Sequence, residues 1–182
     1  SPFYGVFDGN GHTIKGLSIK ITYDLNAYAG LFGFNKGTIY SLGVINSDIT
    51  VSSTGNDSYV GGIIGNNDNG TVSECYTDGS IKITASSDTV YAGGLIGYNS
   101  GAINECYNMG SVTINSSIYS GAITGYNTGS INESSNRGTV SASTSTYVGG
   151  IVGQNGGNGI IGESYNIGKI TAGSSSRTGG IA

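Results

Sequence analysis

Six near-copies of one short glycine-led phrase constrain the fold of this chain more than any other feature. The copies occupy residues 29–33, 61–65, 93–97, 121–125, 149–153 and 179–182, and the last one is cut short. Measured along Gly30, Gly62, Gly94, Ala122, Gly150 and Gly180, the steps are 32, 32, 28, 28 and 30 residues. Periods of this length are typical of solenoids, propellers and arrays, in which a repeat buries its apolar face by stacking on its neighbours.

Composition excludes several classes of protein. Glycine supplies 34 of 182 residues without a three-residue period, which excludes collagen. Charged residues, at 10%, are too few for a disordered polyelectrolyte. The net charge of −4 and the lack of a Lys/Arg cluster argue against nucleic acid and anionic membrane surfaces. No apolar run approaches 18 residues, so we expect no membrane insertion. Both ends interrupt the pattern, so we expect part of a longer protein.

Each repeat contains three short segments with β character. In the second repeat they span 59–65, 71–76 and 80–84, and all are rich in Val, Ile, Tyr and Thr between turn-forming residues. The sequence therefore predicts an all-β fold, a parallel β-helix with about three short strands in each coil of 28–32 residues, right-handed by the usual crossover rule and with almost no helix. We expect one β-solenoid over 1–182, with an opening coil at 1–27 and repeats starting near 28, 59, 91, 119, 147 and 177.

Stacked coils place equivalent residues in columns. One aliphatic column, expected inside, contains Leu31, Ile63, Leu95, Ile123, Ile151 and Ile181. A second contains Ile39, Val72, Ile103, Ile131 and either Ile160 or Ile161. A third contains the pairs Ile49/Val51, Ile81/Ile83, Val112/Ile114 and Val140/Ala142, with polar residues alternating between them. These columns predict a thin, continuous apolar interior.

An orientation in the first segment stays open. If Ile63 points inward, strict alternation turns Val60 and Ile64 outward and creates an exposed apolar strip, which would mark a contact surface. A glycine-allowed bulge at Gly61 and Gly62 would instead turn both side chains inward.

Three polar columns are candidates for sites. Asn35, Asn67, Asn99, Asn127 and Asn155 are expected to form an amide ladder rather than a ligand site, because every coil has one. Cys75 and Cys106 share a column; we favour buried free thiols over a disulfide. Glu74, Glu105, Glu133 and Glu163 are weak candidates for metal binding, with outward, solvated corner positions as the favoured interpretation.

Tyrosines supply the candidate binding residues. One column contains Tyr59, Tyr91, Tyr119 and Tyr147, with Tyr28 within a residue of it, and another contains Tyr76, Tyr107 and Tyr165. Stacked tyrosines usually rigidify a structure, but an exposed row could also contact sugars or a protein partner. The residues that we select as binding candidates are Tyr98, Tyr126, Tyr107 and Tyr165.

The repeats resemble the GLUG motif, in residues 93–112 (GGLIGYNSGAINECYNMGSV) and in the lead-in FDGNGHTI at 7–14. GLUG repeats occur in bacterial surface and secreted proteins, among them adhesin-like proteins and non-catalytic parts of immunoglobulin A-cleaving metallopeptidases. The resemblance implies a β-solenoid outside a bacterial cell and implies no reaction. The fourth copy departs from the pattern at Ala122 and at Ser134-Ser135, and the first has Leu42-Gly43 where Cys-Tyr stands elsewhere.

The sequence contains few residues or motifs of the kinds that enzymes use for catalysis. His12 is the sole histidine and lies in an expected turn, and no hydrolase, zinc-protease or nucleotide-binding motif occurs. We therefore expect no enzyme, no catalytic residues and no cofactor. The expected role is an extracellular or cell-surface binding stalk directed at a glycan or a protein, with oligomeric state unknown. The alternatives are an accessory or catalytic β-helix of a polysaccharide-degrading enzyme or surface protease and, more remotely, an ice-binding surface.

Overall fold

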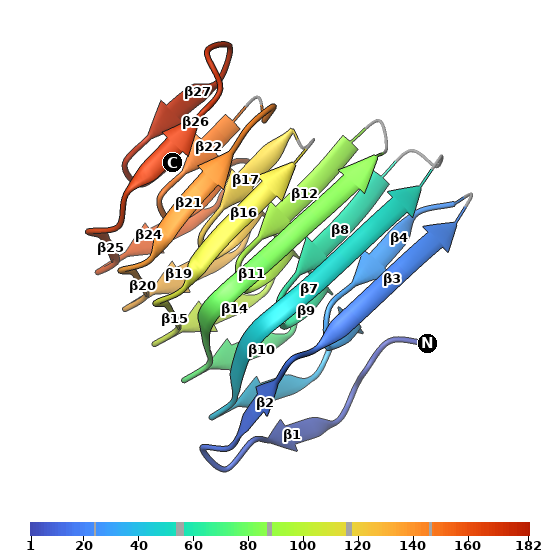
Figure 1. Ribbon diagram of the computed structural model, residues 1–182. Coiled ribbons are helices and arrows are strands. Elements are labelled where there is room, and N and C mark those ends of the chain that lie inside the picture. Colours follow the sequence, from blue (N-terminus) through green and yellow to red (C-terminus); the bar gives the residue numbers. More distant parts are fainter. Residues whose placement is uncertain (24, 54–56, 87–88, 116–117, 146) are drawn as a thin grey trace.

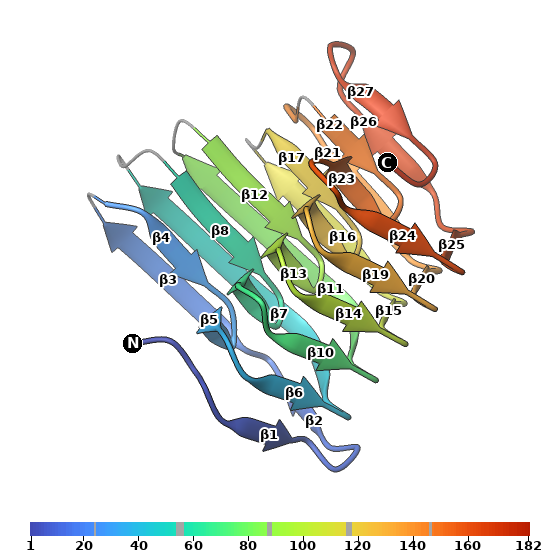
Figure 2. The same cartoon turned by 180° about the vertical axis from the view of Figure 1, so that it is seen from behind.

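The chain forms a β-solenoid in which four parallel sheets run along the stack of coils. The computed structural model describes residues 1–23, 25–53, 57–86, 89–115, 118–145 and 147–182. Its coils follow one another from the N-terminal end, blue in Figure 1, to the C-terminal end, red, and Figure 2 shows the opposite side. Every strand pairing among these residues is parallel, and none of them belongs to a helix that could cross a membrane. The predicted all-β parallel β-helix is confirmed.

A coil visits the four sheets in turn, and the sheets are numbered 1 to 4 in this order. Sheet 1 contains β4 (Ala27–Ala29), β8 (Asp57–Gly61), β12 (Thr89–Gly93), β17 (Tyr119–Gly121), β22 (Tyr147–Gly149) and β27 (Arg177–Gly179). Sheet 2 contains β5 (Phe32–Asn35), β9 (Ile64–Asn67), β13 (Ile96–Asn99), β18 (Thr124–Asn127) and β23 (Val152–Asn155). Sheet 3 contains β1 (Val6–Asp8), β6 (Thr38–Tyr40), β10 (Thr71–Ser73), β14 (Ala102–Asn104), β19 (Ser130–Asn132) and β24 (Ile160–Gly162).

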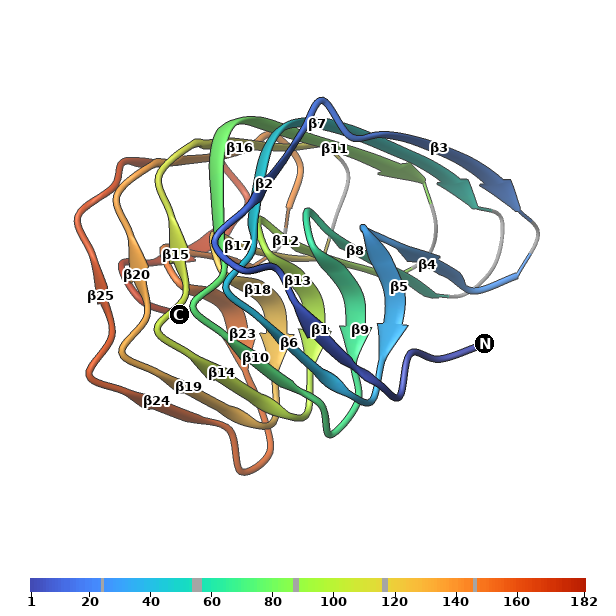
Figure 3. The same ribbon diagram turned by 90° about the horizontal axis from the view of Figure 1, so that it is seen from below.

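Sheet 4 includes the longest strands among the described residues. It contains β2 (Thr13–Lys15), β3 (Ser18–Tyr23), β7 (Gly43–Ser53), β11 (Tyr76–Ser86), β15 (Tyr107–Asn108), β16 (Ser111–Asn115), β20 (Ser135–Asn136), β21 (Thr139–Ala142), β25 (Tyr165–Asn166) and β26 (Ile170–Ala172). The opening residues join the stack, since β1 pairs with β6 while β2 and β3 both pair with β7. Figure 3, seen from below, shows the path of the coils around their interior.

A coil visits four sheets, whereas the sequence predicted three strands. The first predicted segment, 59–65, divides into β8 and β9, and the chain turns between them at Gly62 and Ile63. The glycine-led phrase is the reason for this turn. A Cβ at Gly93, the equivalent of Gly61, would collide with the backbone oxygen of Ile96 in its own coil. Only glycine allows such a close approach of the backbone to itself.

The same turn decides the open orientation in the first segment. Val60, Ile63 and Ile64 are all fully buried, so both aliphatic side chains that strict alternation would expose face the interior. The inward interpretation is confirmed, and the side chains Val60 and Ile64 form no exposed apolar strip.

The predicted aliphatic columns form the interior. Ile63, Leu95, Ile123 and Ile151 are completely buried, and Leu31 in the first coil is half-buried but packs against the same apolar cluster. Ile181 in the last coil is 38% exposed, so the expectation of an inside position was wrong for Ile181. The second column ends at Ile161, which pairs with Ile131, whereas Ile160 is exposed. Interior burial is thus complete only where a coil has a neighbour on both sides.

The register of sheet 4 corrects one predicted alignment. Ile83 pairs with Ile49, and Ile81 pairs with Ser47, because the register shifts between Asp78 and Ile81. The predicted pairing of Ile81 with Ile49 is therefore wrong by two residues. The alternation of side chains has a period of two, so all of these residues still face inward.

Two ladders of asparagine amides connect the coils. The predicted ladder is confirmed: Asn35, Asn67, Asn99, Asn127 and Asn155 each donate or accept an amide hydrogen bond of 2.7–2.8 Å between adjacent coils. A second ladder, which the sequence analysis missed, joins Thr77, Asn108, Asn136 and Asn166 at 2.7–3.0 Å. Most of these asparagines also bond to the backbone of a glycine two residues later, as Asn99 does with Gly101.

The corner between sheets 3 and 4 has an unusual backbone. Glu74, Glu105, Glu133 and Glu163 have positive φ angles of 43–53°, and all four are exposed, as predicted. The next residue closes the corner by donating to the carbonyl oxygen two positions before it. This donor is the thiol of Cys75 or Cys106, or the hydroxyl of Ser134 or Ser164. These four coils therefore place a small hydrogen-bond donor in this column, whereas the buried Leu42 occupies it in the first repeat.

Replacing Asn99 with alanine tests the first ladder. The change leaves the buried amides of Asn67 and Asn127 and the backbone of Gly101 without their partners, so we expect the free energy of unfolding to fall by about 2–3 kcal/mol. Urea denaturation followed by circular dichroism measures it. The matched control is Asn104→Ala, a half-buried position in β14, for which we expect less than about 0.5 kcal/mol. Equal losses in the two variants would contradict the ladder's role.

Substitutions of Cys106 test the corner. Cys106→Ser keeps a donor of the kind found at Ser134, so its stability should stay within about 1 kcal/mol of the parent protein. Cys106→Val removes the donor, so its free energy of unfolding should be about 1–2 kcal/mol lower than that of Cys106→Ser. A valine variant as stable as the serine variant, in the same denaturation assay, would show that the donor is not needed.

Candidate functional site

Five tyrosines stack along the outside of sheet 1. Neighbouring rings have centroid distances of 4.9–5.3 Å and interplanar angles of 5–20°, and the column contains Tyr28, Tyr59, Tyr91, Tyr119 and Tyr147. Tyr28 pairs directly with Tyr59, so it belongs to the column. The next rung is Arg177, whose guanidinium lies 5.1 Å from the Tyr147 ring centroid and donates to the Tyr147 hydroxyl.

Two of the selected tyrosines extend this column sideways. Tyr98 and Tyr126 on sheet 2 stack at 5.5 Å and pack edge-on against Tyr59, Tyr91 and Tyr119, at centroid distances of 5.1–6.0 Å. We call the seven residues together the tyrosine surface: Tyr28, Tyr59, Tyr91, Tyr98, Tyr119, Tyr126 and Tyr147. All are half-buried.

Stacking decides what the tyrosine surface offers to a ligand. Ring faces within each column cover one another, so ring edges and hydroxyl groups are what remains for solvent. A sugar that stacks on an open ring face finds little such area here. A rigid aromatic surface with polar tips is instead typical of protein–protein contact regions.

The Tyr59 and Tyr91 phenols, at the centre of this surface, stay neutral into alkaline conditions because their pKa values are raised. Burial raises the pKa of Tyr91 to about 12, and the nearby charge of Asp57 and the neighbouring tyrosines add to the effect. Burial likewise raises the pKa of Tyr59, whose hydroxyl donates to Asp57 at 3.3 Å. These two phenols are therefore uncharged at neutral pH, and the charge next to them is that of the Asp57 carboxylate.

The other two selected tyrosines lie elsewhere, on sheet 4. Tyr107 stacks on Tyr76 at 5.1 Å, but Ser135 occupies the next rung and separates Tyr107 from Tyr165. Tyr165 is 43% exposed and accepts a hydrogen bond of 2.7 Å from Arg137, which lowers its pKa. The structure thus divides the four candidates between two parts of the molecule.

The candidate metal ligands form a solvated row. Glu74, Glu105, Glu133 and Glu163 occupy successive corners, and Glu74 accepts a hydrogen bond of 2.7 Å from the hydroxyl of Ser41. Within the described ranges, no group of three or more His, Cys, Asp or Glu side chains is arranged to hold a metal ion.

The two cysteines are free and completely buried, as predicted. Burial raises the pKa of the Cys106 thiol well above its usual range, so this thiol is held in its unreactive, protonated form.

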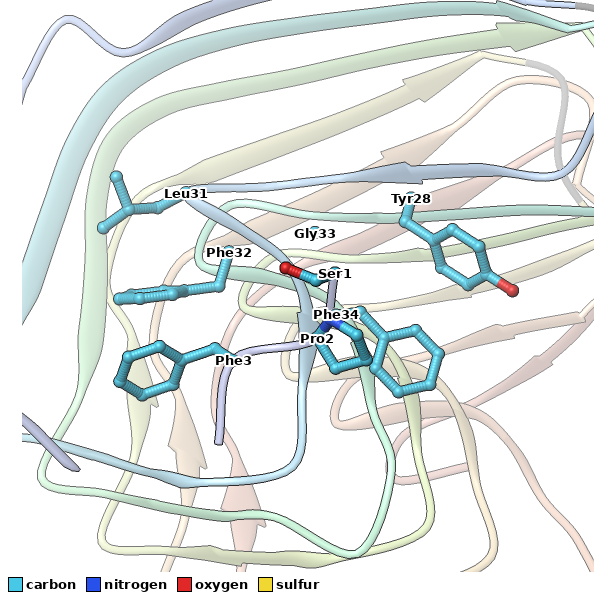
Figure 4. Close-up of a pocket in the computed structure, with 8 residues that line it drawn as sticks. All are labelled: Ser1, Pro2, Phe3, Tyr28, Leu31, Phe32, Gly33 and Phe34. Carbon is cyan, nitrogen blue, oxygen red and sulfur yellow. The ribbon is translucent and has the colours of Figure 1, made fainter. Parts of the chain in front are cut away.

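Two pockets differ in character. The larger, about 600 Å³, opens at the N-terminal end of the stack, where Phe3, Phe32 and Phe34 line it (Figure 4). Phe3 and Phe32 are in ring contact at 5.2 Å, so this pocket is an end of the apolar interior. The second, about 400 Å³, lies beside Ser41 and Glu74 at the corner of sheets 3 and 4. Sequence reasoning noted the departure of the first repeat at Leu42-Gly43 but did not connect it with this pocket.

Alkaline titration tests the tyrosine surface. An unfolded chain ionises its tyrosines near pH 10, whereas folded Tyr91 keeps its proton to about pH 12. The stabilisation is complete below pH 10 and is lost as the pH rises through this window. We expect urea midpoints to fall between pH 10 and 12, and to fall less in Tyr91→Phe, which keeps the stack. Absorbance at 295 nm that shows all 13 tyrosines ionising together near pH 10 in the folded protein would contradict this.

Comparison with known proteins identifies the repeat. The family model of the GLUG motif matches residues 56–84, the coil that contains β8, β9, β10 and most of β11. Searches of curated proteins and of solved structures returned no match. The matched coil pairs in register with the coils on both sides, which continue its columns. The chain is therefore a β-solenoid that carries the GLUG motif.

Proposed function

We propose that this chain is a non-catalytic extracellular module of a bacterial surface or secreted protein. It acts as a binding stalk: its coils span distance, and its sides present a repetitive surface to a partner. Each coil adds about 4.8 Å to the length of the stalk, the spacing of paired strands. The match of the GLUG motif to residues 56–84 supports the setting, because a resemblance to GLUG repeats implies a bacterial surface or secreted protein.

The observation that carries this proposal is the tyrosine surface. Its seven rings extend over five successive coils, fixed by stacking and by edge contacts. Rigid aromatic side chains lose little conformational entropy on binding, and repetition along a stalk multiplies weak contacts. The covered ring faces favour a protein partner over a stacked sugar at this surface.

Adhesion of beads coated with the module tests the proposal. The probes are surfaces of collagen, fibronectin and mucin, and the readout is retention of beads under flow. The double variant Tyr98→Arg/Tyr126→Arg should retain at least tenfold fewer beads. Arginine fits a rung of such a column, as Arg177 does next to Tyr147, so the fold should persist.

The matched control is Thr113→Arg/Ser141→Arg, which adds the same charge to the outer face of sheet 4 and should change retention less than twofold. Retention no better than that of albumin-coated beads on every probe, or an equal effect of both double variants, would contradict the proposal. Release of reducing ends from polysaccharides above the buffer rate would favour the enzymatic alternative.

A further inference from the structure

Two outward columns stop at the same place, in the first repeat. The row of corner glutamates ends at Glu74, because the preceding coil has Ser41 at this corner, with the same left-handed backbone at φ 53°. The column of Tyr107 and Tyr76 ends at Gly43, which pairs with Tyr76. Smaller residues therefore replace two bulky ones within three positions of the chain.

The pocket of about 400 Å³ lies where both columns stop. Its lining includes Asp8 and Asn10 from the opening coil, Tyr40 and Ser41 from the first repeat, and Glu74 and Tyr76 from the second. Tyr107 of the third repeat completes it. The volume falls within the range of small-molecule binding sites.

Its aromatic side is held in position. A Cβ at Gly43 would collide with the ring of Tyr76, so this ring occupies space that only glycine leaves open. The Tyr76 hydroxyl hydrogen-bonds with Thr13 Oγ1 at 2.8 Å, and Tyr107 stacks on Tyr76 at an interplanar angle of 4°. The lining rings are thus fixed before a ligand arrives.

Its polar side offers acceptors and donors. Glu74 Oε2 accepts from Ser41, which leaves this carboxylate a second oxygen, and Asp8 accepts from the Asn10 backbone at 2.7 Å and from the Tyr40 hydroxyl. A hydrogen bond to Asp8 raises the pKa of Tyr40, so that phenol stays neutral. None of the described residues that line the pocket carries a positive charge.

This set of groups selects a class of ligand. Carboxylates with a free oxygen accept hydrogen bonds from adjacent hydroxyl groups, an asparagine amide both donates and accepts, and aromatic carbons contact apolar C–H groups. A pyranose ring presents hydroxyl groups at its edge and C–H groups on its faces. Two carboxylates without a cation repel an anionic sugar.

We propose that this pocket, defined by Asp8, Asn10, Tyr40, Ser41, Glu74, Tyr76 and Tyr107, binds a neutral pyranose unit of a glycan. Glu74 and Asp8 accept from its hydroxyl groups, and the tyrosines contact its C–H groups. The assignment rests on the proposed function, which it extends from the tyrosine surface to a glycan class at another part of the stalk.

The experiment is a glycan array of matched neutral and acidic pairs, such as lactose and 3′-sialyllactose, followed by calorimetry with the neutral glycans that bind. The parent protein should bind neutral members at least tenfold more tightly than their acidic partners. Ser41→Glu places in the pocket the residue that other coils carry at this corner, so the fold should persist while binding falls at least tenfold. Glu74→Gln should weaken binding by about tenfold.

Two controls keep the test specific. Glu133→Gln makes the same change at an equivalent corner away from the pocket, and Thr113→Arg/Ser141→Arg adds charge to the outer face of sheet 4; both should bind neutral glycans within twofold of the parent. Glycan binding that persists in Ser41→Glu and Glu74→Gln would overturn the pocket while the proposed stalk function stands. No glycan binding alongside normal bead adhesion would do the same. Calcium chloride that binds at Glu74 in calorimetry, without any sugar binding, would overturn it in favour of a cation site.

Discussion

In-register stacking of parallel strands is the constraint on which every other feature of this molecule depends. Each coil places a residue directly beside its equivalent in the next coil, so one repeated residue type becomes a column. Inward columns of Ile and Val form the interior, and buried asparagines become amide ladders. Outward tyrosines become a stack whose ring faces cover one another. A shift of one residue in any coil would reverse the faces of its side chains.

Much of the fold could be predicted from the sequence because the repeat itself carries it. The 28–32-residue period, the β-branched segments and the Asn35 to Asn155 column indicated a parallel solenoid with an amide ladder, and the structure has both. The division of segment 59–65 into β8 and β9 was missed, because the sequence Gly-Gly-Ile is compatible both with a continuous strand and with a turn. The predicted alignment of Ile81 with Ile49 was wrong by two residues, and nothing in the sequence indicated this because alternation with period two is unchanged by such an offset.

Sites were harder to predict than the fold, since they depend on where repetition fails. Tyr98 and Tyr126 were selected as separate candidates, but only coordinates show that they pack edge-on against Tyr91 and join one surface. The second asparagine ladder carried the signal Asn-x-Gly at Asn108 and Asn136, the same signal as in the first ladder, and a search for it would have found both. Gly43 was noted as a departure from the repeat and Ser41 was not, and the cavity beside them involves the distant Asp8 and Tyr107.

The measurement that tests the stacking most directly is the distance between two spin labels on sheet 4. Positions 48, 82, 113, 141 and 171 pair successively, so Asp48 and Thr171 lie four rungs apart. With labels at these two positions in a Cys75→Ser/Cys106→Ser background, pulsed electron resonance should give a narrow distribution centred near about 19 Å, four spacings of about 4.8 Å. A broad distribution, or one centred beyond about 30 Å, would contradict in-register stacking and with it the columns that form both proposed binding regions.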